Sequence, residues 1–241
     1  AQPYPFALAH PLEQSPESIG QAADYVVEWK WDGIRAQAIR RGQSTHLWSR
    51  GEERLDNKYP EVEAALEFWP DCVLDGELLA WKGDRPLPFG EMQKRIGRKK
   101  VGKKLLEDVP VRFIAFDVLE YQGQDLRSWP TIQRRILLEE AYQKYRSNCE
   151  TRKPHSVHSV QLSITLPCKT WEDVIDLRDS SEKQGAEGLM LKRADAAYPV
   201  GRPRGPWWKW KVDPRTIDAV LIYAQRGHGK RAALYSDYTF A

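Results

Sequence analysis

One lysine near the start of the chain has the surroundings of an amine nucleophile. Lys30 is flanked by Trp29 and Trp31, and the dipeptide Asp32-Gly33 follows. Aromatic neighbours can hold an amine partly desolvated and so make it reactive toward an electrophile at neutral pH. An exposed lysine in a hairpin explains the pattern Lys-x-Asp-Gly equally well when that pattern is taken alone.

Four further segments combine charged residues with glycine or aromatic residues. They are Asp75-Gly76-Glu77, residues 113–117, residues 187–192 and residues 207–211. Each is weak evidence by itself, because an acidic residue beside glycine is usually a turn and an aromatic residue in a strand is usually core. Side chains alternate along a strand, so Lys209 and Lys211 would share one face and could bind an anion such as phosphate. A solvated strand face is the more common meaning of such a pair.

Strands must position these segments. The β-prone residues 24–40 contain Asp32-Gly33, a strong hairpin-turn signal, and therefore predict two strands joined by a tight turn. The other predicted strands are residues 45–49, 72–81, 111–120, 186–193, 207–212 and 217–224, and the predicted helices are residues 60–69, 130–145 and 171–184, with a helical start at 91–106. Hairpin turns rather than repeated βαβ crossovers predict an α+β fold with largely antiparallel sheets.

The composition excludes several classes of protein. The 241 residues suffice for one large domain, or for one domain and part of a second. With 37 basic and 34 acidic residues the net charge is +3, which excludes a polybasic tail and an acidic disordered chain. Three distant cysteines without a CxxC pair argue against a disulfide framework and a zinc site, so we expect a reducing compartment. No apolar run is long enough to span a bilayer, so we expect no membrane partner.

Taken together and in order, these segments resemble the motifs of the covalent nucleotidyltransferases, which comprise DNA ligases, RNA ligases and mRNA capping enzymes. The matching segments are Lys30-Trp31-Asp32-Gly33 for motif I, Ser49-Arg50-Gly51 for the arginine motif that follows, Phe116-Asp117 for motif III, Arg134-Arg135 for the intermediate arginine motif, Glu187-Gly188 for motif IV and Lys209-Trp210-Lys211 for motif V. The wording of motif I, with the downstream Ser-Arg-Gly, is most similar to ATP-dependent DNA ligases of the bacterial branch that carries a separate N-terminal DNA-binding domain. The resemblance covers residues 4–241.

The resemblance implies a fold and a reaction. Residues 1–215 would form an ATP-grasp-like nucleotidyltransferase domain of mainly antiparallel sheets with flanking helices, and residues 216–241 the truncated start of an OB domain. Lys30 would attack the α-phosphate of ATP to form lysyl-AMP, AMP would pass to the 5′-phosphate of a DNA nick, and the 3′-OH would seal the strand. We expect a core fragment of a longer ligase that binds ATP or carries AMP but seals nicks poorly without its OB domain.

The resemblance also assigns nucleotide-binding residues. Glu28 would recognise the adenine amino group and Phe116 would stack on the base. Lys209 and Lys211 would contact the α-phosphate. The remaining residues of the predicted nucleotide site are Arg35, Arg50 and Glu77, of which the two arginines would hold the ribose or the nick phosphate.

Metal and DNA contacts follow from the same resemblance. Glu77 and Glu187 would lie nearest to Mg²⁺, for which Mn²⁺ could substitute, because hard cations prefer carboxylate oxygens. Asp32 and Arg50 would act at the nick. The basic stretch at residues 94–104 holds seven lysines and arginines and no acidic residue. It would contact phosphates beside the nick, above all through Lys99, Lys100, Lys103 and Lys104, although a solvated loop is an alternative.

Two alternatives remain open from the sequence. An RNA ligase or a capping guanylyltransferase would share the lysine, the metal and the fold. A non-catalytic module could instead clamp nucleic acid with its basic and aromatic residues, since the chain contains ten tryptophans. Under the ligase interpretation we expect a monomer in the bacterial cytoplasm, associated with the nucleoid, whose partners are ATP, nicked double-stranded DNA and the other domains of the same ligase.

Overall fold

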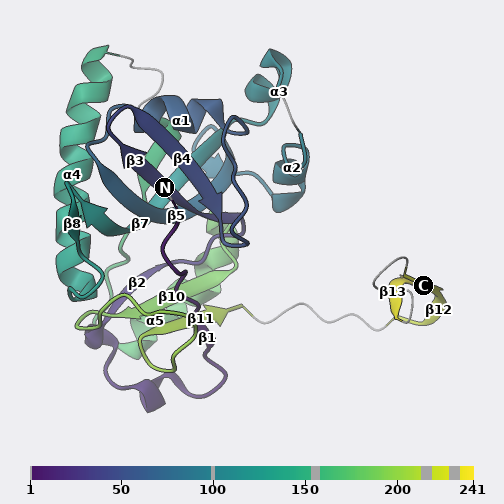
Figure 1. Ribbon diagram of the computed structural model, residues 1–241. Helices are drawn as coiled ribbons and strands as arrows, with labels where there is room; N and C mark the ends of the chain where they lie inside the picture. Colours follow the sequence, from purple (N-terminus) through teal and green to yellow (C-terminus); the bar gives the residue numbers. More distant parts are fainter. Residues whose placement is uncertain (1, 99–100, 153–157, 213–218, 228–233) are drawn as a thin grey trace.

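The computed structural model describes residues 2–98, 101–152, 158–212, 219–227 and 234–241. Two β-sheets form the centre of the structure and face each other across the body of the molecule (Figure 1). A larger sheet has seven strands and a smaller one has four. All but two of the pairings between neighbouring strands are antiparallel, which confirms the predicted fold class; β1 with β11 and β7 with β9 are the parallel pairs.

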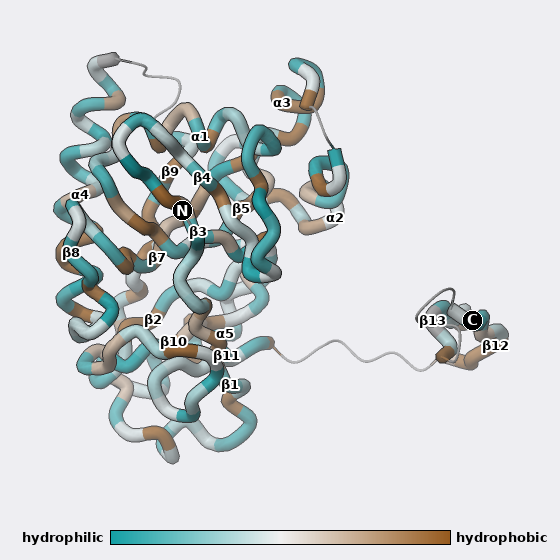
Figure 2. The backbone as a smooth tube through the Cα atoms, in the orientation of Figure 1, coloured by the Kyte–Doolittle hydropathy of each residue, from teal (hydrophilic) through white to brown (hydrophobic). Residues whose placement is uncertain are grey.

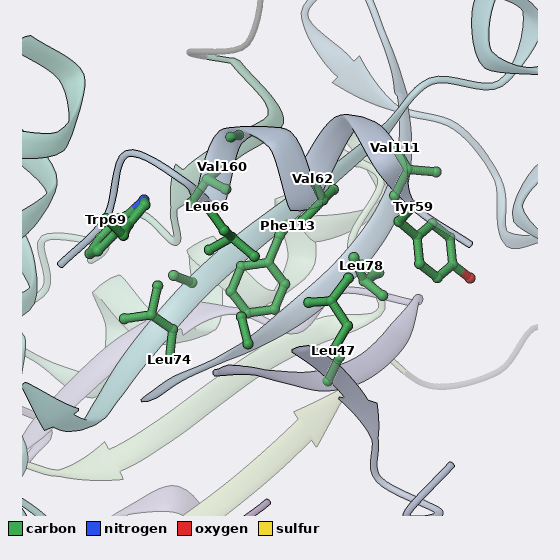
Figure 3. Packing of buried hydrophobic residues seen from close by; sticks show 14 of the residues in the cluster. Leu47, Tyr59, Val62, Leu66, Trp69, Leu74, Leu78, Val111, Phe113 and Val160 are labelled. Atoms are coloured by element: carbon green, nitrogen blue, oxygen red, sulfur yellow. The ribbon is translucent and has the colours of Figure 1, made fainter. Parts of the chain in front are cut away.

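The larger sheet has the strand order β4-β3-β5-β7-β8, with β6 beside β5 and β9 beside β7. Its strands are β3 (Ile34–Arg41), β4 (Ser44–Ser49), β5 (Cys72–Lys82), β6 (Arg85–Pro86), β7 (Val111–Tyr121), β8 (Gln124–Asp125) and β9 (Val160–Leu162). Helices α1 (Pro60–Leu66) and α4 (Thr131–Arg152) cover one face. Figure 3 shows Val62 and Leu66 of α1 close to Phe113 of β7, in the main hydrophobic core.

The smaller sheet has the order β1-β11-β10-β2, formed by β1 (His10–Pro11), β2 (Tyr25–Trp29), β10 (Gly188–Arg193) and β11 (Trp207–Lys211). Helix α5 (Trp171–Ser180) packs on its outer face through Trp171 and Val174, which meet Leu189 and Leu191 of β10. The side chain of Thr170 accepts a hydrogen bond from the backbone of Asp173 and caps this helix. A third cluster, made of Ala7, Ile39, Val73, Leu119, Tyr198 and Trp207, joins the two sheets.

The predicted hairpin over residues 24–40 is wrong, although both of its strands exist. β2 pairs with β10 in the smaller sheet, whereas β3 pairs with β4 and β5 in the larger one. The Asp32-Gly33 segment therefore carries the chain from one sheet to the other. A side chain at Gly33 would collide with the backbone of Leu78, so glycine is needed here for a close approach to β5 rather than for a hairpin turn.

The other predicted elements are largely confirmed. The expected helical start at 91–106 is two short helices, α2 (Phe89–Gln93) and α3 (Lys103–Asp108). The strand expected at 217–224 is β12 (Leu221–Arg226), which pairs only with β13 (Tyr235–Phe240) among the residues described. Figure 1 shows these two strands apart from the larger body, and their apolar side chains, including Ile222 and Phe240, are mostly exposed.

Helix α4 is the longest helix of the described chain, with 22 residues. Hydrophilic and hydrophobic residues alternate along it (Figure 2). Within the described ranges, no helix combines the length and the apolar character that a membrane crossing requires.

Candidate active site

A cavity of about 280 Å³ lies between the two sheets. Its walls include residues of β2, β3, β5, β7, β10 and β11. All eight residues predicted to react with or bind the nucleotide line it: Glu28, Lys30, Arg35, Arg50, Glu77, Phe116, Lys209 and Lys211. The structure thus brings together residues that are as far as 183 positions apart in the chain, from 28 to 211.

Strand periodicity explains which side chains of the smaller sheet face the cavity. Glu28 of β2, Met190 of β10 and Lys209 of β11 are neighbours across the sheet and all line the cavity. Their chain neighbours Val27 and Leu189 point to the opposite face, where they join the core beneath α5. Lys209 and Lys211 therefore share a face, as the Lys-x-Lys spacing predicts.

Lys30 is held by a carboxylate at the edge of the cavity. Its Nζ lies 2.7 Å from Oε2 of Glu187, and Nζ of Lys211 lies 2.9 Å from the same oxygen. The backbone amide of Lys30 donates to the carbonyl of Gly188 at 2.8 Å, and the amide of Glu187 donates to the carbonyl of Lys30 at 2.8 Å. A side chain at Gly188 would collide with the backbone of Trp210, so this glycine permits the close contact of β10 with β11.

The acidic groups beside Lys30 have opposite pKa shifts. Burial by itself raises the pKa of Glu187, but the hydrogen bonds from Lys30 and Lys211 outweigh it, and the pKa is lowered. The pKa of Asp32 is raised by burial and by the negative charge of Glu187. Asp32 lines a second, larger cleft rather than the cavity, and this cleft of about 1650 Å³ also reaches Glu187, Lys209 and Lys211.

Glu77 is a carboxylate without a fixed partner. No hydrogen bond or ion pair to Glu77 occurs among the described side chains, and burial raises its pKa to about 7, with Arg35 and Lys30 acting in the opposite direction. An unpartnered carboxylate in the wall of a polar cavity fits a hard cation. No three histidine, cysteine or acidic side chains of the described chain converge on one point, so a metal here would take most of its ligands from phosphate and water.

Arg35 lines the cavity and is held in place by an ion pair with Asp75. Its Nε and Nη2 donate to the two carboxylate oxygens of Asp75 at 2.7 Å each. Asp75 also accepts a hydrogen bond from the hydroxyl of Tyr198 at 2.5 Å. The Arg35 guanidinium lies 4.7 Å from the centre of the Phe116 ring. Asp75 therefore occupies two donors of Arg35, which leaves Nη1 for a ligand.

Sequence reasoning missed Lys192, which also lines the cavity. Its ammonium forms an ion pair with Oε2 of Glu28 and lies 4.1 Å from the centre of the Phe116 ring. The other oxygen of Glu28 accepts a hydrogen bond from Nη1 of Arg135 at 2.9 Å. Period-two spacing from Met190 could have placed Lys192 on this face. The pairing of Glu28 with Arg135, 107 positions away, leaves no signal in a single sequence.

The residues predicted to contact DNA are dispersed. Lys99 and Lys100 lie outside the described residues. Lys103 and Lys104 are exposed on α3 and do not line the cavity. Arg95 of the same basic stretch is completely buried and donates to Glu61 at 2.8 Å and to the carbonyl of Val109 at 2.6 Å. For Arg95 the predicted phosphate contact is wrong, because its charge is already neutralised inside the fold.

Known proteins resemble this chain along most of its length. A family profile described as "ATP dependent DNA ligase domain" matches residues 6–211. A "Probable DNA ligase" of Koribacter versatilis is 34% identical over 99% of this chain and 44% of that protein. A DNA ligase of Archaeoglobus fulgidus is 29% identical over 99% of this chain and 41% of that protein. The chain therefore spans less than half the length of these relatives.

Solved structures agree with the sequence matches. A mycobacterial DNA ligase D complexed with ATP and MES is 25% identical, with a TM-score of 0.67 over 98% of this chain and 67% of that chain. The Chlorella virus DNA ligase–adenylate, at 18% identity and a TM-score of 0.58 over 92% of this chain and 74% of that chain, supports the fold alone. The profile match, the relatives and the cavity that Lys30 lines lead to one conclusion: the chain is an adenylation domain and belongs to the family of ATP-dependent DNA ligase domains.

Proposed function

We propose that this chain activates ATP and transfers AMP to nicked DNA as the adenylation part of a longer ligase. The observation that carries the proposal is the placement of Lys30 at the edge of a cavity that also holds an aromatic ring, a buried carboxylate and three further lysines. The mycobacterial relative that was solved with ATP supports the same nucleotide here.

Lys30 forms the bond to AMP. Its amine attacks the α-phosphate, an N–P bond forms, the P–O bond to pyrophosphate breaks, and the amine releases a proton. Lys211 shares Glu187 with Lys30, so an arriving phosphate can replace Glu187 as the partner of both ammonium groups. Lys209 lies on the same face and adds a further positive charge. Positioning and charge neutralisation are the main catalytic terms in phosphoryl transfer.

The base of the nucleotide and the metal would lie at different ends of the cavity. Phe116 stacks on the base and Glu28 faces its edge, while Arg35 and Arg50 lie toward the ribose and phosphates. Glu77, together with Glu187, would hold Mg²⁺ or Mn²⁺, and the bound cation would neutralise charge on the phosphate oxygens. The unpartnered carboxylate of Glu77 supports this assignment.

The larger cleft gives DNA a route to the adenylate. Lys209 and Lys211 line both the cavity and the cleft, so a 5′-phosphate that enters past Asp32 reaches the same cations that hold AMP. AMP then passes from Lys30 to this phosphate, and the adjacent 3′-OH displaces AMP. Arg50 would contact the nick phosphate, and the exposed Lys103 and Lys104, with Lys99 and Lys100, would contact the flanking backbone.

The finer fold assignment also belongs to this proposal. Residues 1–215 form the ATP-grasp-like nucleotidyltransferase domain, and 216–241 begin an OB domain. The exposed apolar side chains of β12 and β13 support this division, because they would be covered by further strands of the same domain. The remaining OB domain and an N-terminal DNA-binding domain would then be the partners of this chain within one ligase.

A covalent adduct tests the proposed function directly. We expect the chain, or the longer ligase that contains it, to gain the mass of AMP after incubation with ATP and Mg²⁺. Lys30→Ala should remove the adduct, whereas Lys144→Ala, an exposed lysine of α4, should retain it. If the longer ligase gains no adduct under these conditions, the enzyme interpretation fails and the non-catalytic module is favoured.

Competition between nucleotides and between nicked substrates separates the remaining alternatives. A capping guanylyltransferase would form its adduct with GTP in preference to ATP. An RNA ligase would use ATP but would seal a nick in RNA in preference to one in DNA. We expect ATP and nicked DNA to be preferred.

A further inference from the structure

Arg50 reaches the cavity from the tip of a short hairpin of residues 44–56. Strand β4 ends at Ser49, whose amide donates to the carbonyl of Glu53 at 2.9 Å. Residues 53–56 therefore run back along β4, with Arg50 in the turn between the two segments. Because the Arg50 side chain lines the cavity, the shape of this turn decides where its guanidinium lies.

Packing does not hold the tip of this hairpin. Residues 50–54 are all exposed, and Glu52 has a φ of 60°, a left-handed conformation that is costly for a residue with a side chain. The amide of Arg50 donates to the carbonyl of Arg35 at 3.0 Å, but no described side chain forms a hydrogen bond or a salt bridge with its guanidinium. Polar contacts within the hairpin must therefore keep the turn in place.

The carboxylate of Asp56 ties the two segments of the hairpin together. Its Oδ1 accepts a hydrogen bond from the amide of Leu47 at 3.1 Å, and its Oδ2 lies 3.1 Å from Nδ1 of His46. Oδ2 also accepts from Nη2 of Arg54 on the returning segment. Burial by itself raises the pKa of Asp56, but the hydrogen bonds from Arg54, His46 and Leu47 outweigh it, and the pKa is lowered. The ionised carboxylate therefore joins β4 to the residues that follow the turn.

Asp56 lies outside the site that it would affect. It lines neither the cavity nor the larger cleft. Arg50, by contrast, lines the cavity, and its charge acts on the carboxyl group of Glu77, where it opposes the rise in pKa that burial causes. An effect of Asp56 on the reaction would therefore be transmitted through the hairpin to Arg50.

We propose that Asp56 is a positioning residue that fixes the hairpin of residues 44–56 and so directs Arg50 into the cavity. This inference rests on the proposed function, because it takes the ribose or the nick phosphate as the partner of Arg50. Asp56 itself touches neither nucleotide nor DNA in this scheme. Without its carboxylate the turn is free to move, and Arg50 leaves the orientation that the transfer of AMP requires.

Double-mutant kinetics test the proposal. The longer ligase that contains this chain is adenylated with ATP and Mg²⁺, and the rate at which AMP passes to nicked DNA is measured in a single turnover. We expect Arg50→Ala to lower this rate about a hundredfold and Asp56→Ala about tenfold. In the Arg50→Ala background, Asp56→Ala should cost less than about a further twofold, because no guanidinium is left to be positioned.

Asp71→Ala is the matched control. Asp71 holds the turn at the opposite end of β4, where its Oδ1 accepts a hydrogen bond from the amide of Gly42 at 2.7 Å, and neither residue lines the cavity. Its loss should leave the rate of AMP transfer within about twofold of the wild-type rate. If Asp71→Ala slows the transfer as much as Asp56→Ala, any loosening of β4 suffices and the specific role of Asp56 is overturned.

Hydrogen exchange shows whether the hairpin moves. Peptides that cover residues 44–56 should exchange faster in Asp56→Ala than in the wild-type ligase, whereas peptides from the larger core should be unchanged. Asp56→Asn keeps an oxygen for the amide of Leu47, so it should retain more of the rate. Asp56→Asn also replaces Asp56→Ala in the double-mutant comparison if the alanine variant does not fold.

The outcomes separate this inference from the proposed function. A wild-type rate in Asp56→Ala, or the same slowing by Asp56→Ala with and without Arg50, would overturn the positioning role and leave the ligase function intact. A wild-type rate in Arg50→Ala would overturn it too, because there would be no contact to position. A wild-type ligase that forms no adduct would instead refute the proposed function, and this inference with it.

Discussion

Two glutamates in this domain each hold two cations, and they differ in burial. Glu28 binds Arg135 and Lys192 in the wall of the cavity and is 2% exposed. Glu187 binds Lys30 and Lys211 in the wall of the larger cleft, and its side chain is 25% exposed. A carboxylate with two cationic partners thus occurs once in a buried and once in a partly solvated environment.

The difference in burial determines how easily each glutamate can give up its partners. A buried ion pair cannot lose one partner cheaply, because the remaining charge is left without water. The Glu28 network is therefore suited to holding a fixed pattern of donors and acceptors. Solvent screens the Glu187 network, so its ion pairs can break at small cost, as the proposed exchange of Glu187 for a phosphate requires. Under the proposed function, we expect the geometry around Glu28 to stay constant during the reaction and the geometry around Glu187 to change.

The largest expected effect is on the stability of the buried network. Arg135→Met leaves Glu28 with a single buried partner, so we expect the free energy of unfolding to fall by about 3–5 kcal/mol. Denaturant unfolding followed by tryptophan fluorescence measures it. Replacing Glu28, Arg135 and Lys192 together by methionine should recover most of this loss, because no unpaired charge then remains buried. A loss below about 1 kcal/mol in Arg135→Met would remove the distinction between the two networks.

Glu187→Gln should affect the reaction strongly and the stability of the fold only weakly, unlike Arg135→Met. The amide no longer holds Lys30 and Lys211 in place, so we expect the rate of AMP adduct formation to fall by about a hundredfold, as for other displaced reactive groups. The free energy of unfolding should change by less than about 1 kcal/mol, because the group is partly solvated. Adduct formation by mass and unfolding by denaturant are measured on the same protein. An unfolding penalty as large as that of Arg135→Met would show that both networks are structural.

The lysines of α3 represent a third kind of charge, without a buried partner. Lys103 is 92% exposed, and its nearest acidic group, on Glu107, is 4.0 Å away. Replacing Lys103 and Lys104 by alanine should leave stability unchanged and reduce the salt slope of nicked-DNA binding by about 0.9 for each phosphate that these lysines neutralise in the wild-type complex. Filter binding from low to moderate salt measures the slope. An unchanged slope would remove these lysines from the DNA interface.

The smallest effect is expected at an ordinary surface ion pair. Arg146 and Glu150 on α4 lie 2.9 Å apart with both side chains about half exposed, at 47% and 50%. Arg146→Ala should lower the free energy of unfolding by about 0.3–0.5 kcal/mol. The loss measured for Arg146→Ala is the reference value for a solvated ion pair, against which the loss for Glu187→Gln is compared. A much larger loss in Arg146→Ala would show that exposure does not make an ion pair weak in this protein.

Local patterns predicted more of the site than of the fold around it. Alternation along the strands correctly placed Lys209 beside Lys211, because side-chain direction depends only on backbone period. The same reasoning failed at Asp32-Gly33, where a turn signal indicates that the chain bends but not which strand it will pair with. The sequence groups Arg95 with the cations predicted to contact phosphate, because its partner Glu61 lies 34 positions away and leaves no local signal.

The sequence by itself determined the order of the charged segments and the antiparallel strands, and it predicted Lys30 as the reactive lysine, since these depend on residue type and short-range spacing. Only the tertiary structure decided that Lys30 faces Glu187, that Arg35 is tied to Asp75, and that Lys192 is buried between Glu28 and Phe116. These contacts arise where two sheets meet. Whether a charge there is paired or free depends on burial and on partners far along the chain, which no local pattern encodes.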